Sequence, residues 1–278
     1  MTATSETIYS YHADANALGG SIVQPFTRII PSQAQVSLPA AGGFTSARTG
    51  AFNFEEIVSC SAAYCFAAGS RDQRTGGWVT LVTAVVENFT LLGMVTAERI
   101  VSQLSIQHAA TTVEGATSFP PPRVTFAGAQ YHNLRIAGFE VQPEINLDLL
   151  TPTESPTGQP WRKNEGLLKA AREQHQLRMA NTGTPDWVDR RYGSSDEAVV
   201  KRGYVLASLV NGFQGTIVGK AYGNIVEISE FGRFSFAELS VHDDIFRLTM
   251  LRAELGCAVH GSATTGTTGS NGGPVGHG

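Results

Sequence analysis

A histidine lies beside two aspartates at one place in the chain, His242-Asp243-Asp244, and this triplet could supply a base next to two carboxylates. The residues on both sides alternate between apolar and polar, which predicts two strands joined by a hairpin at the triplet. Hairpin tips commonly use Asp for local backbone hydrogen bonds. A second acidic pair, Glu55-Glu56, would point its carboxylates to opposite faces of a strand, whereas glycoside hydrolysis needs two carboxylates around one bond. Neither group therefore predicts a catalytic site.

Motifs for other chemistry are missing, because the chain contains no P-loop, dinucleotide-binding glycine motif, nucleophile elbow or zincin helix. Cys60 and Cys65 are five positions apart, so a single strand over 54–69 would place them on opposite faces, where they cannot form a disulfide. Cys257 and the scattered histidines lack the spacing of a metal site. We therefore assign no catalytic, cofactor-binding or metal-binding residue, and we expect no cofactor and small buried thiols.

Aromatic side chains could stack against sugar rings, as they do on many carbohydrate-binding surfaces. The tryptophans and most of the tyrosines are dispersed along the chain, and we expect most of them in the core or at its rim: Trp78, Trp161, Trp187, Tyr9, Tyr11, Tyr131 and Tyr204. Carbohydrate binding is therefore a hypothesis from fold class alone.

Two segments, 88–93 and 133–138, share the spacing Asn, apolar, polar, apolar, any residue, Gly. Alternating apolar positions closed by Gly predict a short half-buried strand that runs into a turn or bulge. Asn88-Phe89-Thr90 also matches a glycosylation sequon, but the equivalent 133–135 does not. We therefore interpret the shared Asn as a turn residue or a side-chain hydrogen-bonding residue.

Composition favours turn-rich β structure. The 278 residues include 30 glycines, 42% are apolar and only 16% are charged, so a large core can form without many helix-favouring residues. A net charge of −4 gives no basic footprint for nucleic acid. No stretch is long and apolar enough for a transmembrane helix, and the first twenty residues have no signal-peptide pattern. We expect a protein that is cytoplasmic or exported without a cleaved N-terminal signal.

Changes in composition divide the chain into four parts. These are the first part of a β domain (1–150), a helical insertion with linkers (151–203), the second part of the β domain (204–260) and a Gly/Ser/Thr tail (261–278) that we expect to be flexible. The first part contains a predicted long hairpin, 54–69 and 78–87 around a polar tip. In the second part the apolar face of 245–255 switches near Met250, which predicts a bulge or burial on both faces.

The insertion contains one predicted helix, 161–179, with a thin apolar stripe that includes Leu167, Ala171 and Met179. Such a helix is expected to lie on the outside of a sheet or to project from the body. Its surroundings are basic and could dock an acidic partner, although a solvated helix face explains the same charges. If the flanking strands are neighbours, removing the insertion should leave the β core folded, because loop-closure entropy grows slowly with length.

The predicted fold is mainly β, a β-sandwich or distorted barrel with a helical insertion. The alternative is a stacked β-solenoid, suggested by the Asn-to-Gly repeat. The chain also resembles a set of uncharacterised bacterial proteins of similar length, in segments that cover most of it outside the helix: 30–34, 36–39, 42–44, 86–88, 91–99, 133–138 and 248–252. The resemblance implies a bacterial origin and a single integrated β domain, and it transfers no activity or site.

Three functions fit these features. A non-enzymatic structural or self-assembling protein leads, because motifs are missing and lysines, which protect strand edges, number only four. We accordingly expect a homo-oligomer whose edges are covered by another subunit or by the insertion. The alternatives are a carbohydrate or surface-ligand binding module, and a hydrolase whose site assembles from distant segments.

Overall fold

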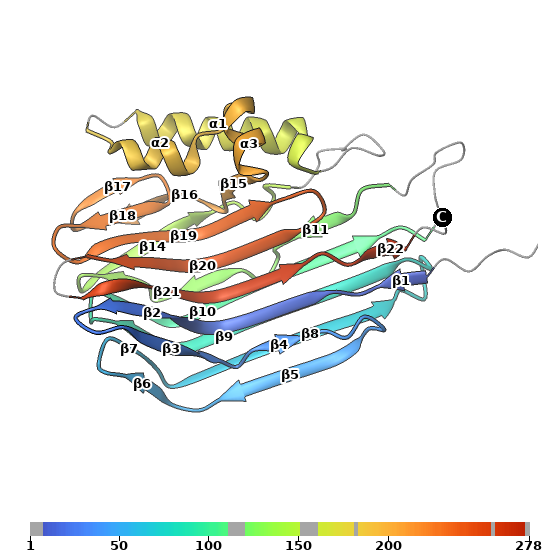
Figure 1. Ribbon diagram of the computed structural model, residues 1–278, viewed down its shortest axis with the longest axis horizontal. Coiled ribbons are helices and arrows are strands. Elements are labelled where there is room, and N and C mark those ends of the chain that lie inside the picture. Colours follow the sequence, from blue (N-terminus) through green and yellow to red (C-terminus); the bar gives the residue numbers. More distant parts are fainter. Residues whose placement is uncertain (1–7, 111–119, 151–160, 181–182, 257–258, 276–278) are drawn as a thin grey trace, which may run out of the picture.

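The protein is a sandwich of two antiparallel β-sheets with helices along one side (Figure 1). This computed structural model describes residues 8–110, 120–150, 161–180, 183–256 and 259–275. Within these ranges every strand pairing is antiparallel and no sheet closes on itself. The predicted β-sandwich with a small helical insertion is therefore confirmed.

The first sheet has eleven strands. Its main path runs through β16 (Val210–Gly215), β14 (Phe139–Ile145), β13 (Arg135–Ile136), β10 (Val95–His108), β9 (Trp78–Leu91), β7 (Val58–Cys60) and β6 (Phe52–Phe54). Off this path lie β8 (Ala62–Arg71), which joins β9 to β5 (Gly43–Thr49), and two short partners of β10, β11 (Arg123–Thr125) and β12 (Gln130–His132). The predicted long hairpin is β8–β9, closed by the pair Arg71 and Trp78.

The second sheet has nine strands. They are β17 (Lys220–Tyr222), β18 (Ile225–Ile228), β19 (Gly232–Val241), β20 (Phe246–Leu255), β21 (His260–Ser270), β2 (Ala13–Gln24) and β3 (Arg28–Gln33), with β15 (Val205–Ser208) beside β19 and β4 (Val36–Ser37) beside β2. A separate pair, β1 (Ile8–Ser10) and β22 (Gly273–Val275), lies at one end.

Small residues line part of the interface between the sheets. On β8 the inward residues are Ala63, Cys65 and Ala67, all buried, and β2 lies across from this strand. The interface also contains a buried polar contact between the sheets: the hydroxyl oxygens of Ser102 on β10 and Thr268 on β21 are hydrogen-bonded at 2.9 Å. These small side chains let the two sheets approach closely. The large aromatic residues of β8, Tyr64 and Phe66, lie on its outer face.

Four strands of the second sheet exchange their inward and outward faces at one row. Ala237 on β19 and Gly266 on β21 have φ of 46° and 62°, and on β20 the buried set changes from even to odd numbers after Met250. β2 changes in the same way at Leu18. The Tyr131 hydroxyl of the first sheet donates to the Met250 carbonyl. The predicted face switch near Met250 is thus confirmed, and it is shared across the sheet.

Three hairpin tips stand side by side at one end of the first sheet. Each tip contains two consecutive residues with positive φ: Glu55 and Glu56, Leu92 and Gly93, and Ala137 and Gly138. Type I′ turns need this geometry. Leu92 donates its N–H to the Ile57 carbonyl and Ala137 donates to the Met94 carbonyl, each at 2.7 Å, so neighbouring tips are bonded. The prediction that Glu55-Glu56 lies on a strand is wrong, because the pair forms a tip.

The two predicted repeats share their backbone geometry as well as their spacing. Asn88 and Asn133 both have φ of 47°, and their side-chain amides donate to Ser61 Oγ at 2.9 Å and Glu98 Oε2 at 2.5 Å. The interpretation of both as turn or hydrogen-bonding residues is therefore confirmed. Because the repeats form antiparallel hairpins within one sheet, they do not stack as the turns of a solenoid.

The helical insertion is more structured than its sequence indicates. It contains η1 (Trp161–Lys163), α1 (Glu165–Met179), α2 (Asp186–Tyr192) and α3 (Asp196–Arg202), although only the first helix was expected. Asn164 caps α1 by accepting from the Leu167 N–H at 3.0 Å. Leu167 and Ala171 join the main core as predicted, whereas Met179 is exposed. Within the described residues, no helix is both long and apolar enough to cross a membrane.

Two further expectations are wrong. The segment 54–69 is not one strand, because it is interrupted at Ser61, whose N–H bonds the Glu87 carbonyl at 2.9 Å. Cys60 and Cys65 therefore both face the interior, and both are free thiols. Cys257 lies outside the described residues.

The expected flexible tail is in large part a central strand. Residues 260–270 form β21, which pairs with β20 on one side and β2 on the other. Its burial relies on small and β-branched side chains, with Thr265 and Thr268 in the interior and Gly266 close to Met250 and Ser102. A strand can therefore be buried here without large apolar residues.

Candidate functional site

The strand β5 forms one edge of the first sheet and is open along that edge. It pairs with β8, and no strand of the described residues pairs with its other side. In Figure 1 it lies at the side of the sandwich opposite the helices. Its seven residues contain no Pro and no Lys, the residues that usually protect edges. This edge is thus a free array of backbone donors and acceptors.

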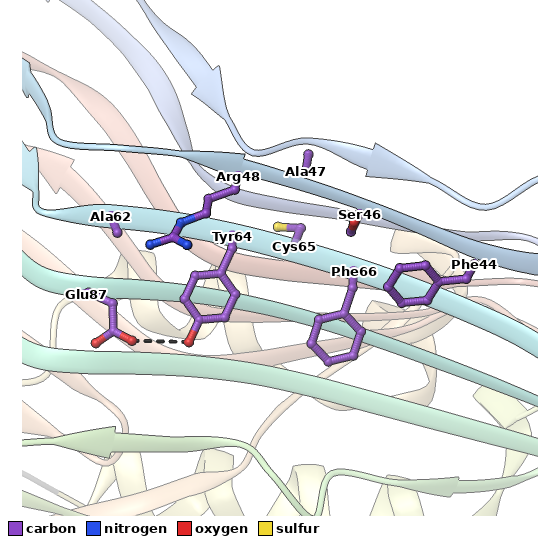
Figure 2. Close-up of a pocket in the computed structure, with 9 residues that line it drawn as sticks. All are labelled: Phe44, Ser46, Ala47, Arg48, Ala62, Tyr64, Cys65, Phe66 and Glu87. Carbon is purple, nitrogen blue, oxygen red and sulfur yellow. Dashed lines mark hydrogen bonds between the residues drawn. The ribbon is translucent and has the colours of Figure 1, made fainter.

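The outer face of β5 and β8 carries a row of aromatic rings. Phe44 is 69% exposed, and its ring lies 6.4 Å from that of Phe66 at an interplanar angle of 26°. Tyr64 and Phe66 are two positions apart on β8 and so face the same way. Figure 2 shows the three rings along the sheet, with Arg48 above Tyr64.

A shallow pocket of ≈ 570 Å³ covers this face, and we call it the β8 pocket. Its lining includes Phe44, Ser46, Arg48, Tyr64, Phe66 and Glu87. Its volume lies within the range of small-molecule sites, about 300–1,000 Å³. The pocket therefore combines aromatic faces with charged and hydroxyl groups.

The polar end of the β8 pocket is held by a short chain of contacts. The Tyr64 hydroxyl donates to Glu87 Oε1 at 3.2 Å, and Arg99 Nε donates to both Glu87 oxygens at 2.9 and 3.1 Å. Burial and the bond to Glu87 raise the pKa of Tyr64, so its phenol stays protonated at neutral pH. Glu87 is thereby an occupied acceptor, and this end provides orientation more readily than acid or base chemistry.

A second hollow, of ≈ 250 Å³, lies on the outer face of the second sheet, and we call it the Arg252 pocket. Its lining includes Arg191, Glu238, His242, Arg247, Thr249 and Arg252. Arg191 belongs to α2 and the others to β19, β20 and the tip between them. This pocket is therefore built where the insertion meets the sheet.

The predicted triplet 242–244 forms the β19–β20 tip, as expected for a hairpin. His242 donates its N–H to the Ile245 carbonyl at 3.0 Å, and Asp243 pairs with Arg162 at 2.6 Å. The Asp244 pKa is raised by burial and by Asp243. Among the described residues, no three His, Cys, Asp or Glu side chains gather where they could hold a metal ion.

The dispersed aromatic residues lie largely in the interior, as expected. Tyr9 stacks on Trp78 at 5.0 Å, and Trp161 meets Phe246 at 5.6 Å. Sequence reasoning missed the row on β5 and β8. Its signal was the alternation in 62–68 of small residues with Tyr64 and Phe66, in which the larger residues face outward.

Fold and site together define a β-sandwich with a helical insertion, an open edge and two surface pockets. Residues 9–242 match the family described as a domain of unknown function (DUF8256). The match covers most of the chain, so the chain belongs to this family, consistent with the resemblance to uncharacterised proteins. No curated protein matches it.

Proposed function

We propose that the chain is a self-assembling β protein in which two copies pair through β5. The observation that carries this is the open edge of β5, since unpaired strand N–H and C=O groups favour another strand as a partner. An antiparallel second copy would extend the first sheet across a two-fold axis. The other edges of the sandwich are shorter or contain Pro31, Lys220 or the glycines of β16.

The side chains of β5 support pairing of two identical strands. Ser46 is the middle residue of Gly43–Thr49, so full overlap places Ser46 against its own copy. In that register Phe44 faces Arg48 of the second copy on the outer face, and no like charges oppose each other. A guanidinium over a phenyl ring is a favourable cation–π contact. The pair would also join two β8 pockets into one continuous aromatic groove.

Light scattering on the wild type and two lysine variants tests the proposal. In Ser46→Lys, two ammonium groups would meet at the two-fold axis, whereas the side chain is solvated in a single copy. We expect the wild type to be a dimer and Ser46→Lys to be a monomer with unchanged circular dichroism. Ser105→Lys is the matched control, because Ser105 lies on the outer face of β10, a strand paired on both sides. A monomeric wild type, or dimers in all three proteins, would contradict the proposal.

Carbohydrate binding is the second candidate, and the aromatic row of the β8 pocket favours it. The near-parallel rings of Phe44 and Phe66 offer flat apolar faces, while Arg48 and Ser46 could bond hydroxyl groups. Sugar rings stack on such faces and are oriented by such polar groups. Retardation in gels that contain soluble polysaccharides tests this candidate.

A further inference from the structure

The face switch in the second sheet creates the Arg252 pocket. Without it, residues 247, 249 and 251 would share the outer face and Arg252 would point into the core. Because β20 changes face after Met250, Arg247, Thr249 and Arg252 all lie outside, and the same change on β19 brings Glu238 beside them. The pocket is therefore a direct consequence of the backbone in this row.

Glu238 is buried, and its acceptor capacity is used within the protein. Arg191 binds it through Nε at 3.1 Å and Nη2 at 3.0 and 3.1 Å, Arg252 Nε donates at 2.6 Å, and the Tyr192 hydroxyl also donates to it. Burial alone would raise the Glu238 pKa, but Arg191 and Arg252 outweigh burial and hold this pKa below its ordinary value. Glu238 thus acts as a fixed anchor for two guanidinium groups.

The guanidinium groups keep donors for a ligand. Arg252 donates through Nε alone to the described residues, so both of its Nη groups are available. Arg247 faces Asp14 at 3.7 Å, beyond hydrogen-bond distance, and its side chain is half exposed. Arg191 and Arg233 share Glu254. These four guanidinium groups meet the carboxylates of Glu238, Glu254 and Asp14, so positive charge is in excess among them.

We propose that the Arg252 pocket binds a small oxyanion of the phosphate or phosphate-monoester class. Arg252 and Arg247 would donate to the anion, with the Thr249 hydroxyl between them on β20. Arg252 is preorganised for such bonds, because its side chain is already held by Glu238 and has lost part of its entropy. The volume of ≈ 250 Å³ suits a small ligand and is less than most drug-sized molecules need.

Isothermal titration with inorganic phosphate, in chloride buffer of matched ionic strength, tests the proposal. We expect saturable binding with one phosphate per chain. Arg247→Gln should weaken binding about tenfold, the loss of one charge-assisted contact. Arg247 leaves the Glu238 anchor intact, so the variant should fold, and circular dichroism verifies this.

Arg123→Gln is the matched control, since it removes the same charge from an exposed position of β11 in the first sheet and should bind phosphate like the wild type. A second readout is the side-chain NMR signal of Arg252 Nε, which should shift on titration in the wild type. Three results would overturn the proposal: no saturable binding, equal weakening by Arg123→Gln and Arg247→Gln, or tighter binding of succinate than of phosphate.

Discussion

His108 lies in a buried aromatic cluster at one end of the sandwich, 5.3 Å from the Tyr9 ring. Burial lowers its pKa from 6.5 to about 4, although a backbone hydrogen bond to Gly272 opposes the change. The folded protein therefore binds the His108 proton less readily than the unfolded chain does. Between these two pKa values the unfolded state holds the additional proton, so stability falls as pH falls.

We compare the free energy of unfolding of the wild type with that of His108→Phe, which carries a neutral side chain of similar shape, and consider the difference between the two. From pH 7 to pH 5 this difference should drop by about 2 kcal/mol, because one unit of pKa shift corresponds to about 1.4 kcal/mol. Urea unfolding at each pH measures it. A difference that does not change with pH would contradict a buried neutral His108.

Long-range side-chain contacts explain why the pockets were not predicted. Arg191 and Glu238 are 47 positions apart, and only the docking of α2 on β19 brings them together. Glu55-Glu56 and His242 were candidates because each is adjacent to another titratable residue in sequence. Of these residues, only His242 lines one of the two pockets, and its partners there include Arg191, which is distant in sequence.

The two Asn-to-Gly repeats predicted a strand that runs into a turn, and each of them ends in one of the three hairpin tips. Asn88 and Asn133 adopt φ of 47°, a left-handed conformation that costs most residues about 1–2 kcal/mol but suits Asn and Gly. Asn133→Ala should therefore be less stable than Asn133→Gly by about 1 kcal/mol, since both lose the bond to Glu98 and only Ala is strained. Thermal or urea unfolding compares the two variants. Equal stabilities would show that the backbone conformation is not the constraint.

Strands whose residues alternate clearly between the two faces were predicted from the sequence, and strands without this alternation were not. β8 and β9 alternate regularly between their two faces, and the hairpin predicted from them was found, although its first strand begins at Ala62 and not at residue 54. The segment 51–56 is a third unit of similar pattern, missed because Ala51 and Glu56 stand where the repeats have Asn and Gly. β21 was expected to be flexible because its Gly, Ser and Thr carry little apolar area, yet its neighbours supply the packing.

The two sides of the sandwich differ in how they are covered. Helices cover the side at β15 to β18, whereas β5 remains open on the opposite side (Figure 1). The insertion is anchored by buried polar side chains: Gln174 bonds the Ser208 carbonyl at 2.7 Å and Arg178 bonds Asn224 at 2.8 and 3.0 Å. One side is therefore closed within the chain, and the proposed second copy would close the other.

A cysteine at the proposed two-fold axis tests self-assembly most directly. In Ser46→Cys, on a Cys257→Ser background, the two introduced thiols of a β5–β5 pair would lie within disulfide reach, since paired strands place opposite Cα atoms about 4.5–5.5 Å apart. Cys60 and Cys65 are buried and should not react; burial raises the Cys65 pKa to about 12. After mild oxidation, non-reducing electrophoresis and mass spectrometry should show a dimer linked through residue 46, and Ser105→Cys should remain a monomer on the gel. Absence of the residue-46 disulfide, or equal linking at residue 105, would contradict the proposed assembly.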